Sequence, residues 1–128
     1  MPPTVGDQMN GKVDWEFARD AVGGDTQLLF ELVEIFFEEY PKLIAGIQTS
    51  MESKAYPELR RFAHTLKGCL RYFGKTQAGK LSGQLEVMGR EKNIESAPKL
   101  FADLQAELNA LLPELKAFVA SQSPENEA

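Results

Sequence analysis

The chain has 128 residues, of which 43% are hydrophobic and 26% charged, so it has the length and composition of one soluble globular domain. Its formal net charge of −5 disfavours nucleic acids as partners, and no stretch approaches the ~20 consecutive apolar residues that a membrane span requires. Because the start lacks the features of a signal peptide and the single cysteine, Cys69, has no partner for an internal disulfide, we expect a cytoplasmic protein.

The two ends of the chain are rich in proline, glycine and polar residues, which predicts flexible segments over residues 1–12 and 121–128 around one domain at 13–120. Between them we find no strand-like alternation, but apolar residues recur with helical period. The first predicted helix is short and covers residues 14–22. Asp14 can cap its start, and Gly23 with Gly24 ends it.

A longer helix is predicted after Asp25, which can cap its start. Its apolar face repeats at helical spacing and contains Leu28 or Leu29, Leu32, Phe36, Leu43 and Ile47. Four glutamates, at positions 31, 34, 38 and 39, face elsewhere. We expect Pro41 to bend or break this helix.

A third helix is predicted to start near residues 53–57, with Pro57 in its first turn, and to run to Gly74. A fourth covers about Thr76 to Arg90. The last has a seam in steps of four and three, interrupted late by Pro113 and formed by Ala97, Phe101, Leu104, Leu108, Leu111, Leu115 and Phe118. Because short connections favour antiparallel neighbours, the sequence predicts an all-α fold, an antiparallel up-down four-helix bundle with a short additional N-terminal helix.

The only histidine of the chain, His64, lies in the third predicted helix, within RRFAHTLKGCLRYFG at residues 60–74. With about 100° per residue, the apolar side chains of this helix cluster on one face and His64 lies about 170° from the centre of that face. The members of that face are Leu59, Phe62, Leu66, Cys69, Leu70 and Phe73. The sequence therefore predicts an exposed His64, which leaves a displayed nucleophile or an idle surface histidine.

Lys67 and Gly68 follow His64 by three and four residues, so both border it on the helix surface. A neutral imidazole is a nitrogen nucleophile near neutral pH, and a nearby ammonium can neutralise the charge of a phosphoryl group that it accepts. Glycine inside a helix costs about 1 kcal/mol relative to alanine. We infer that Gly68 is kept to leave the space above the imidazole open.

The fourth predicted helix carries Gly79, Gly83, Glu86 and Arg90 on one stripe, away from its apolar residues. Two glycines inside a helix indicate a groove. If this stripe lies beside His64, Glu86 can accept a hydrogen bond from one ring nitrogen and leave the other free to attack. The alternative is an ordinary solvated pair between Glu86 and Arg90 at i,i+4.

The charges are unevenly distributed along the chain. Residues 60–92 contain eight basic and two acidic side chains, a net charge of +6, whereas the rest of the chain carries −11. A basic region around His64 on an acidic molecule favours an acidic or phosphorylated partner.

These motifs resemble the histidine-containing phosphotransfer (HPt) domain of two-component phosphorelays. The stretch His-Thr-Leu-Lys-Gly at 64–68 and the later Gly74 are similar to the H-x-L-K-G motif of that family and its downstream glycine, and Leu85-Glu86 looks like the Leu-Glu of its next helix. Upstream, Gly-Gly-Asp at 23–25 and Phe36 are also similar. The resemblance covers most of residues 14–118.

The resemblance implies a phosphoryl carrier and not an autonomous kinase. His64 would accept a phosphoryl group from the aspartyl-phosphate of one receiver domain and pass it to the aspartate of another. Lys67 would steady the phosphoryl group, and Glu86 would orient the imidazole. Candidate docking residues are Arg60, Arg61, Gly68, Arg71, Gly79, Gly83 and Arg90.

The same resemblance implies the partners and the cofactors. The expected partners are response-regulator receiver domains and a hybrid sensor histidine kinase, and we expect a monomer. We expect no metal or cofactor bound to the chain itself, because Mg²⁺ belongs to the partner receiver domain in this family.

The sequence departs from the usual pattern of the family at Cys69, Leu70, Arg71, Tyr72 and Lys75, where small residues are common. These departures concern packing and the choice of partner. One alternative is a non-catalytic helical adaptor or dimerisation module that binds receiver or kinase domains through the basic groove. An enzyme with His64 as general base is less favoured because the histidine lies on a convex helix surface, and one histidine with one core-facing cysteine is a poor ligand set for a metal.

Overall fold

The computed structural model describes residues 13–122. Of the segments predicted to be flexible, 1–12 and 123–128 lie outside the described residues, whereas Ser121 and Gln122, which were assigned to the flexible tail, form the end of the last helix. Within 13–122 there are five α-helices and no strand. They are α2 (Trp15–Ala21), α3 (Thr26–Ser53), α4 (Tyr56–Leu70), α5 (Gln77–Glu91) and α6 (Ala97–Gln122), with a 3₁₀ turn η1 (Arg71–Phe73) after α4. No helix in this part of the chain has the length and apolar character that crossing a bilayer requires.

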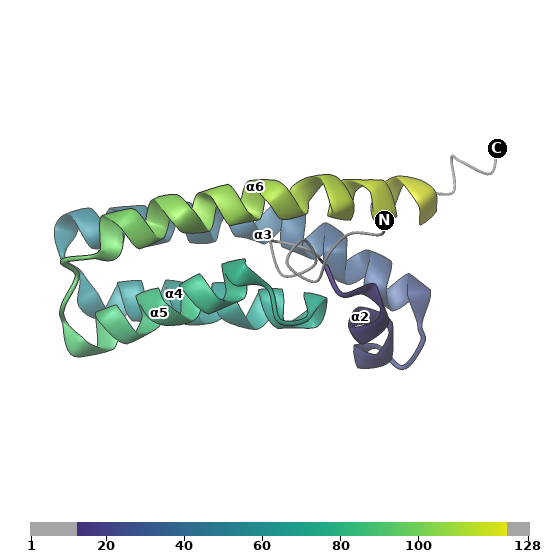
Figure 1. The fold of residues 1–128 in the computed structure, drawn as a ribbon, viewed down its shortest axis with the longest axis horizontal. Coiled ribbons are helices and arrows are strands. Elements are labelled where there is room, and N and C mark those ends of the chain that lie inside the picture. The colour runs from purple at the N-terminus through teal and green to yellow at the C-terminus, as the bar shows by residue number, and fades with distance from the viewer. Residues whose placement is uncertain (1–12, 123–128) are drawn as a thin grey trace, which may run out of the picture.

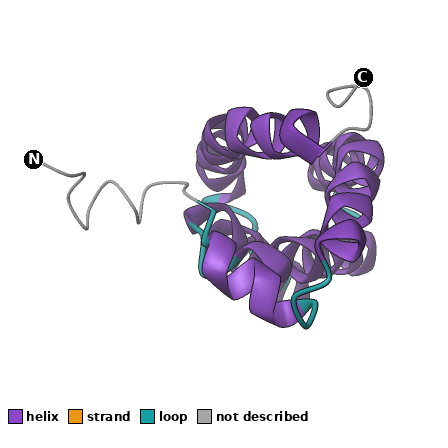
Figure 2. Cartoon of the chain, turned by 90° about the vertical axis from the view of Figure 1, so that its right-hand side faces the viewer, coloured by secondary structure: helices purple, strands orange, loops and turns teal. Residues whose placement is uncertain are grey.

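The four longer helices form an antiparallel bundle, which confirms the predicted fold (Figure 1). The view along the bundle shows them arranged around a common axis (Figure 2). With 28 and 26 residues, α3 and α6 extend beyond α4 and α5, which have 15 residues each. The short α2 lies against the extended part, where Trp15 stacks on Phe118 of α6 with ring centroids 4.8 Å apart.

Three helices begin at side-chain caps that are visible in the sequence. Asp14, Asp25 and Thr76 each accept a hydrogen bond at 3.0 Å from the backbone amide three residues later. Such caps satisfy amides that have no partner within the helix. The ends of α3 and α5 are less predictable, because they are formed by Lys54 and Lys92 in the left-handed conformation that glycine usually adopts.

The core runs along the axis of the bundle. All seven residues of the predicted seam of α6 are buried. On α3, Leu29, Phe36 and Ile47 are buried as expected, but Val33 takes the place that was predicted for Leu32, which is only partly buried. Leu32 was predicted because its side chain is larger than that of Val33. The buried positions 29, 33 and 36 are separated by four and three residues, and this spacing keeps one face of the helix toward the core.

Neither Pro41 nor Pro113 breaks its helix, so the interruption predicted at Pro113 is wrong, and so is the break that was one of the two outcomes expected at Pro41. Pro41 lies inside a continuous α3, and Pro113 lies inside a continuous α6. Each proline removes one helical hydrogen bond, and its cost is about 3 kcal/mol in an isolated helix. Both helices continue because apolar side chains beyond the prolines are buried in the core, Leu43 and Ile47 on α3 and Leu115 and Phe118 on α6.

Two glycines allow α4 to pack closely against its neighbours. A Cβ atom on Gly46 would lie 2.7 Å from the ring of Phe62, so with any larger residue here the ring or the two helices would have to shift. A Cβ atom on Gly89 would lie 2.8 Å from the backbone nitrogen of Arg60, which brings the backbones of α5 and α4 into direct contact. The contact at Gly89 sets the distance between α4 and α5, and the candidate site lies between these two helices.

The α-helix of the histidine segment ends earlier than predicted. It stops at Leu70 and continues as the 3₁₀ turn, and Gly74, with a φ of 96°, ends the turn as expected. The carbonyl of Phe73 accepts a hydrogen bond at 2.9 Å from the amide of Asp14, so the turn is fixed to the start of α2. Phe73 packs edge-on against Phe36, with ring centroids 5.5 Å apart.

Candidate functional site

His64 projects from the middle of α4 into solvent, as the helical wheel predicted. Its side chain is 66% exposed, whereas Ala63 and Leu66, on either side of it, are buried in the core. The imidazole is therefore accessible to a partner, and the opposite face of the helix that carries it packs against the core.

Glu86 of α5 holds the imidazole. Its Oε2 atom lies 2.9 Å from Nδ1 of His64, and its Oε1 atom lies 2.8 Å from Nζ of Lys67. The residue is only 9% exposed. One nearly buried carboxylate thus fixes both the exposed imidazole and the ammonium one helical turn later, and the interaction predicted from the stripe on the fourth helix is present.

The charge of Glu86 determines which ring nitrogen is free. The hydrogen bond from Lys67 lowers the pKa of Glu86 most; burial acts in the opposite direction, and the hydrogen bond from His64 lowers it further. An ionised carboxylate can only accept hydrogen bonds. In neutral His64 the proton therefore lies on Nδ1, and Nε2 carries the lone pair on the solvent side.

The glycine stripe of α5 faces α4. A Cβ atom on Gly83 would lie 3.3 Å from Cδ of Lys67, so the absence of a side chain gives the lysine room to cross α5 toward Glu86. A Cβ atom on Gly79 would lie 3.3 Å from Oγ1 of Thr76. Gly68 differs from both, because a Cβ atom there would meet nothing within 4 Å, as expected for an open approach to His64.

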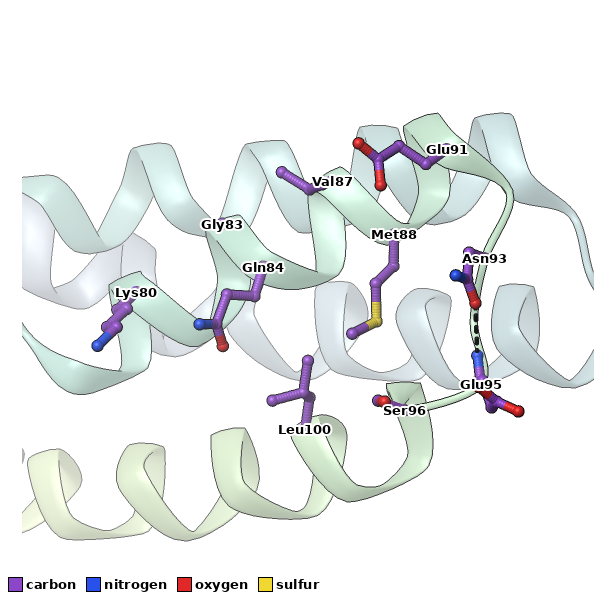
Figure 3. A pocket seen from close by; sticks show the side chains of 10 residues that line it. All are labelled: Lys80, Gly83, Gln84, Val87, Met88, Glu91, Asn93, Glu95, Ser96 and Leu100. Atoms are coloured by element: carbon purple, nitrogen blue, oxygen red, sulfur yellow. Dashed lines mark hydrogen bonds between the residues drawn. The ribbon is translucent and has the colours of Figure 1, made fainter.

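The stripe borders three hollows, two of which share Lys80 as a lining residue. Gly83 borders a groove between α5 and α6, whose apolar part is formed by Val87, Met88 and Leu100 (Figure 3). Gly79 borders a second cavity, at the turn between α4 and α5. His64 lies in a third, shallow hollow lined by Pro57, Arg60, Arg61, His64 and Glu86. The predicted groove is therefore divided, and His64 is not in the part that Gly83 opens.

The other predicted docking residues are accessible. Arg60, Arg61, Arg71 and Arg90 are exposed, and the first two line the hollow of His64. The alternative prediction of a solvated pair between Glu86 and Arg90 is wrong, because the ion-pair partners of Glu86 within 13–122 are His64 and Lys67. Glu86 is turned toward α4, so its carboxylate lies between the helices.

Sequence reasoning did not assign Phe17 and Tyr72 to the site. These aromatic side chains are 47% and 42% exposed, and with Ala21 and Arg71 they line a hollow at Gly68. Exposed large apolar groups that gather beside a reactive side chain are typical of protein-binding surfaces. No periodic pattern indicates them, because Phe17 lies on α2 and Tyr72 on the 3₁₀ turn, and only the packing of α2 against that turn brings them together.

Cys69 does not add a second reactive group. It is partly buried, and burial raises the pKa of its thiol, with a further increase from the charge of Glu39. The thiol therefore stays protonated near neutral pH, which makes it a poor nucleophile. Among residues 13–122, no three His, Cys, Asp or Glu side chains are grouped in a way that would hold a metal ion.

The fold and the site together define a class of protein. The bundle displays a histidine whose Nδ1 atom is held by a buried carboxylate, and the same carboxylate binds the ammonium of a lysine. Such a histidine is suited to carry a phosphoryl group between partners.

Comparisons with known proteins give the family. The family model described as Hpt domain matches residues 31–115, more than half of the chain, so the chain belongs to the Hpt domain family. Members of this family are phosphocarrier intermediates of phosphorelays, in which they act with receiver and hybrid kinase domains. Histidine phosphotransfer in phosphorelays is the role of this family.

One curated relative and one solved structure are similar to this chain. The phosphorelay intermediate protein rdeA of Dictyostelium discoideum is 22% identical over 107 residues, which cover 84% of this chain but only 42% of that protein. The crystal structure of the HPT domain from the Hpt sensor hybrid histidine kinase from Shewanella matches with a TM-score of 0.75 and 18% identity, over 87% of this chain and 96% of that one. At this identity the structural likeness supports the bundle fold.

Proposed function

We propose that His64 is the residue that carries the phosphoryl group and that Nε2 is its nucleophilic atom. The observation that carries this proposal is the 2.9 Å hydrogen bond between Nδ1 of His64 and the buried carboxylate of Glu86. It occupies one ring nitrogen and directs the lone pair of the other toward solvent.

The transfer step needs no proton movement. The lone pair of Nε2 attacks the phosphorus of an aspartyl-phosphate, a P–N bond forms, and the P–O bond to the aspartyl carboxylate breaks. The carboxylate leaves with the electron pair of that bond. The product is an imidazolium with a proton on Nδ1, and its positive charge is stabilised by Glu86. Transfer onward to a second aspartate is the same step in reverse.

Lys67 supports the step from the same face. Its ammonium is held by Glu86 at 2.8 Å, on the helical turn after His64, where it can neutralise part of the charge of the phosphoryl group. The contact with Glu86 also fixes the lysine before a partner binds. Preorganisation of this kind avoids a cost of reorganisation during the reaction.

The donor and acceptor in this proposal are receiver domains of response regulators and of a hybrid sensor histidine kinase. The receiver supplies Mg²⁺, the chain binds no cofactor of its own, and it does not phosphorylate itself from ATP. We further propose that it acts as a monomer in the cytoplasm. The basic side chains around His64 complement the cluster of carboxylates of a receiver.

The docking surface in this proposal has an apolar centre and a basic rim. Phe17 and Tyr72 border the opening at Gly68, and Arg60, Arg61 and Arg71 provide the charges. Aromatic residues and arginine are the side chains that contribute most to protein interfaces. We therefore expect Phe17→Ser to raise the KM for a phosphorylated receiver while the intrinsic reactivity of His64 is unchanged.

The test is phosphoryl transfer from a ³²P-labelled receiver to the wild-type chain and to His64→Gln. We expect an acid-labile, base-stable adduct on the wild type and none on the variant. If a panel of receivers labels neither protein while both remain folded by circular dichroism, the carrier function is refuted. Receiver binding without labelling would then favour the adaptor function.

A further inference from the structure

A second basic cavity lies next to the transfer site, at the turn between α4 and α5. Its volume is about 770 Å³, which is within the range of small-molecule pockets, about 300–1,000 Å³. Four of its lining residues are basic and none is acidic; the lining consists of Lys67, Leu70, Arg71, Gly74, Lys75, Thr76, Gln77, Gly79 and Lys80. The hollow of His64, in contrast, contains the carboxylate of Glu86.

The cations of this cavity are not neutralised by the fold. Among the ion pairs within residues 13–122, none includes Arg71, Lys75 or Lys80. The chain has no acidic residue between Glu58 and Glu86. The side chain of Asp14 lies beside Gly74 at the cavity wall, but it caps α2 by accepting a hydrogen bond from the amide of Phe17 and forms no ion pair with these cations. Like charges that converge on a concave surface repel one another, and their field is focused in the cavity.

We propose that this cavity, which we call the Lys75–Lys80 cavity, binds a small phosphate-bearing anion. Lys75 and Lys80 approach from the turn and from α5, and Arg71 approaches from the 3₁₀ turn after α4. Arginine pairs with phosphate in a bidentate manner, and lysine binds phosphate as a point charge. Several cations in a lining that contains no acidic side chain favour an anion with more than one phosphate group, such as a pyrophosphate.

A small anion fits this cavity better than a protein partner does. The transfer reaction requires a receiver over His64, whereas Lys75 and Lys80 line a separate cavity beyond Lys67 and are absent from the hollow of His64. The cavity is concave, with Leu70 and the missing side chain of Gly79 at its wall. A concave, cationic volume of this size can surround a small polyanion and exchange its water for charge-assisted hydrogen bonds.

Lys67 links this cavity to the transfer site. It lines the cavity, and its ammonium is held by Glu86 at 2.8 Å. An anion in the cavity and the carboxylate of Glu86 therefore compete for one ammonium. Occupancy of the cavity would weaken the support that Lys67 gives to phosphoryl transfer, and this consequence, unlike the binding itself, rests on the proposed function.

The test is a titration of the ¹⁵N-labelled full chain with inorganic pyrophosphate, followed by NMR at constant ionic strength. We expect saturable shifts at the amides of Arg71 to Lys80. The double variant Lys75→Gln/Lys80→Gln should bind at least about tenfold more weakly, because charge-assisted hydrogen bonds are lost. The matched control is Arg60→Gln/Arg61→Gln, which removes the same charge outside the cavity and should change the affinity less than twofold.

A third variant tests the link to Lys67 without any transfer assay. Glu86→Gln frees the ammonium of Lys67 and should tighten pyrophosphate binding several-fold, whereas Glu91→Gln, with the same change of charge on exposed surface, should not. Equal losses of pyrophosphate affinity in the two double variants, or chemical shift changes centred on His64, would refute the proposal. Either result would mean that pyrophosphate is attracted by the overall positive charge and not bound in this cavity. The absence of saturable shifts would refute it as well, and slower receiver transfer in Lys75→Gln/Lys80→Gln would then assign these lysines to protein docking. None of these NMR results depends on whether His64 is phosphorylated.

Discussion

Glu86 lies 2.9 Å from His64 although the two residues are 22 positions apart and belong to different helices. The contact depends on the close packing of α4 and α5, for which Gly89 leaves space at the backbone of Arg60. The same carboxylate holds Lys67. The proposed reactivity of the exposed imidazole is thus set by a residue that is almost completely buried.

Replacement of Glu86 by glutamine should slow phosphoryl transfer without unfolding the protein. The amide can still accept a hydrogen bond from Nδ1, but it no longer stabilises the imidazolium or holds Lys67. We expect a fall of about tenfold in kcat/KM, which corresponds to about 1.4 kcal/mol. Single-turnover transfer from a phosphorylated receiver measures it, with Glu91→Gln as the control of equal charge. Equal rates for the two variants would contradict the role of Glu86.

The ion pairs of Glu86 should also appear in the dependence of stability on pH. The pKa of Glu86 is lowered in the folded state from an ordinary value of 4.5, mainly by the hydrogen bond from Lys67. A group with a depressed folded pKa contributes stability that is present above its unfolded pKa and is lost as the pH falls through the folded pKa. Between pH 6 and pH 3, the loss in free energy of unfolding should therefore be larger for the wild type than for Glu86→Gln. Urea titrations at a series of pH values measure both, and parallel curves would count against the charged pairs.

Substitutions of Gly68 should increase the stability of the helix but hinder the docking of a receiver. A side chain there meets nothing within 4 Å, and alanine is favoured over glycine in helices by about 1 kcal/mol. Gly68→Ala should therefore raise the free energy of unfolding, which urea denaturation would measure. Gly68→Leu should reduce transfer from a receiver more than about tenfold, because it fills the approach to His64. Phosphorylation of His64 by phosphoramidate, a small donor, should be much less affected; an equal loss with both donors would mean that Gly68 acts on the imidazole itself.

Gly89→Ala should lower the free energy of unfolding, whereas Gly68→Ala should raise it. A Cβ atom there would lie 2.8 Å from the backbone nitrogen of Arg60, so α4 and α5 must separate. Overpacking of this kind costs about 1–3 kcal/mol. Urea denaturation should show a lower free energy of unfolding than for the wild type, in contrast to Gly68→Ala. An unchanged or higher stability would show that the two helices can shift without cost.

Much of the fold can be predicted from local sequence signals. The caps Asp14, Asp25 and Thr76 and the seam of α6 identify the helices, because side-chain hydrogen bonds and apolar periodicity are local properties. The prolines are different. Whether Pro41 and Pro113 interrupt their helices depends on burial of the residues beyond them, which is a property of the assembled bundle.

The site was predictable to a similar extent. The helical wheel of α4 places His64 on the surface, and the stripe of α5 indicates Glu86 as its neighbour, so the central contact follows from periodicity. The aromatic surface formed by Phe17 and Tyr72 could not be predicted, because it arises from the position of α2 on the 3₁₀ turn. The close approach at Gly89 likewise depends on the register between two helices.

In the proposed mechanism, Nε2 of His64 carries the phosphoryl group while Nδ1 is held by Glu86. The most direct measurement is ¹⁵N and ³¹P NMR of the full chain with labelled imidazole, after phosphorylation by a receiver. We predict one phosphohistidine with the P–N bond at Nε2 and the proton on Nδ1, and no signal from His64→Gln. Phosphorylation at Nδ1, or on a residue other than His64, would rule out this mechanism.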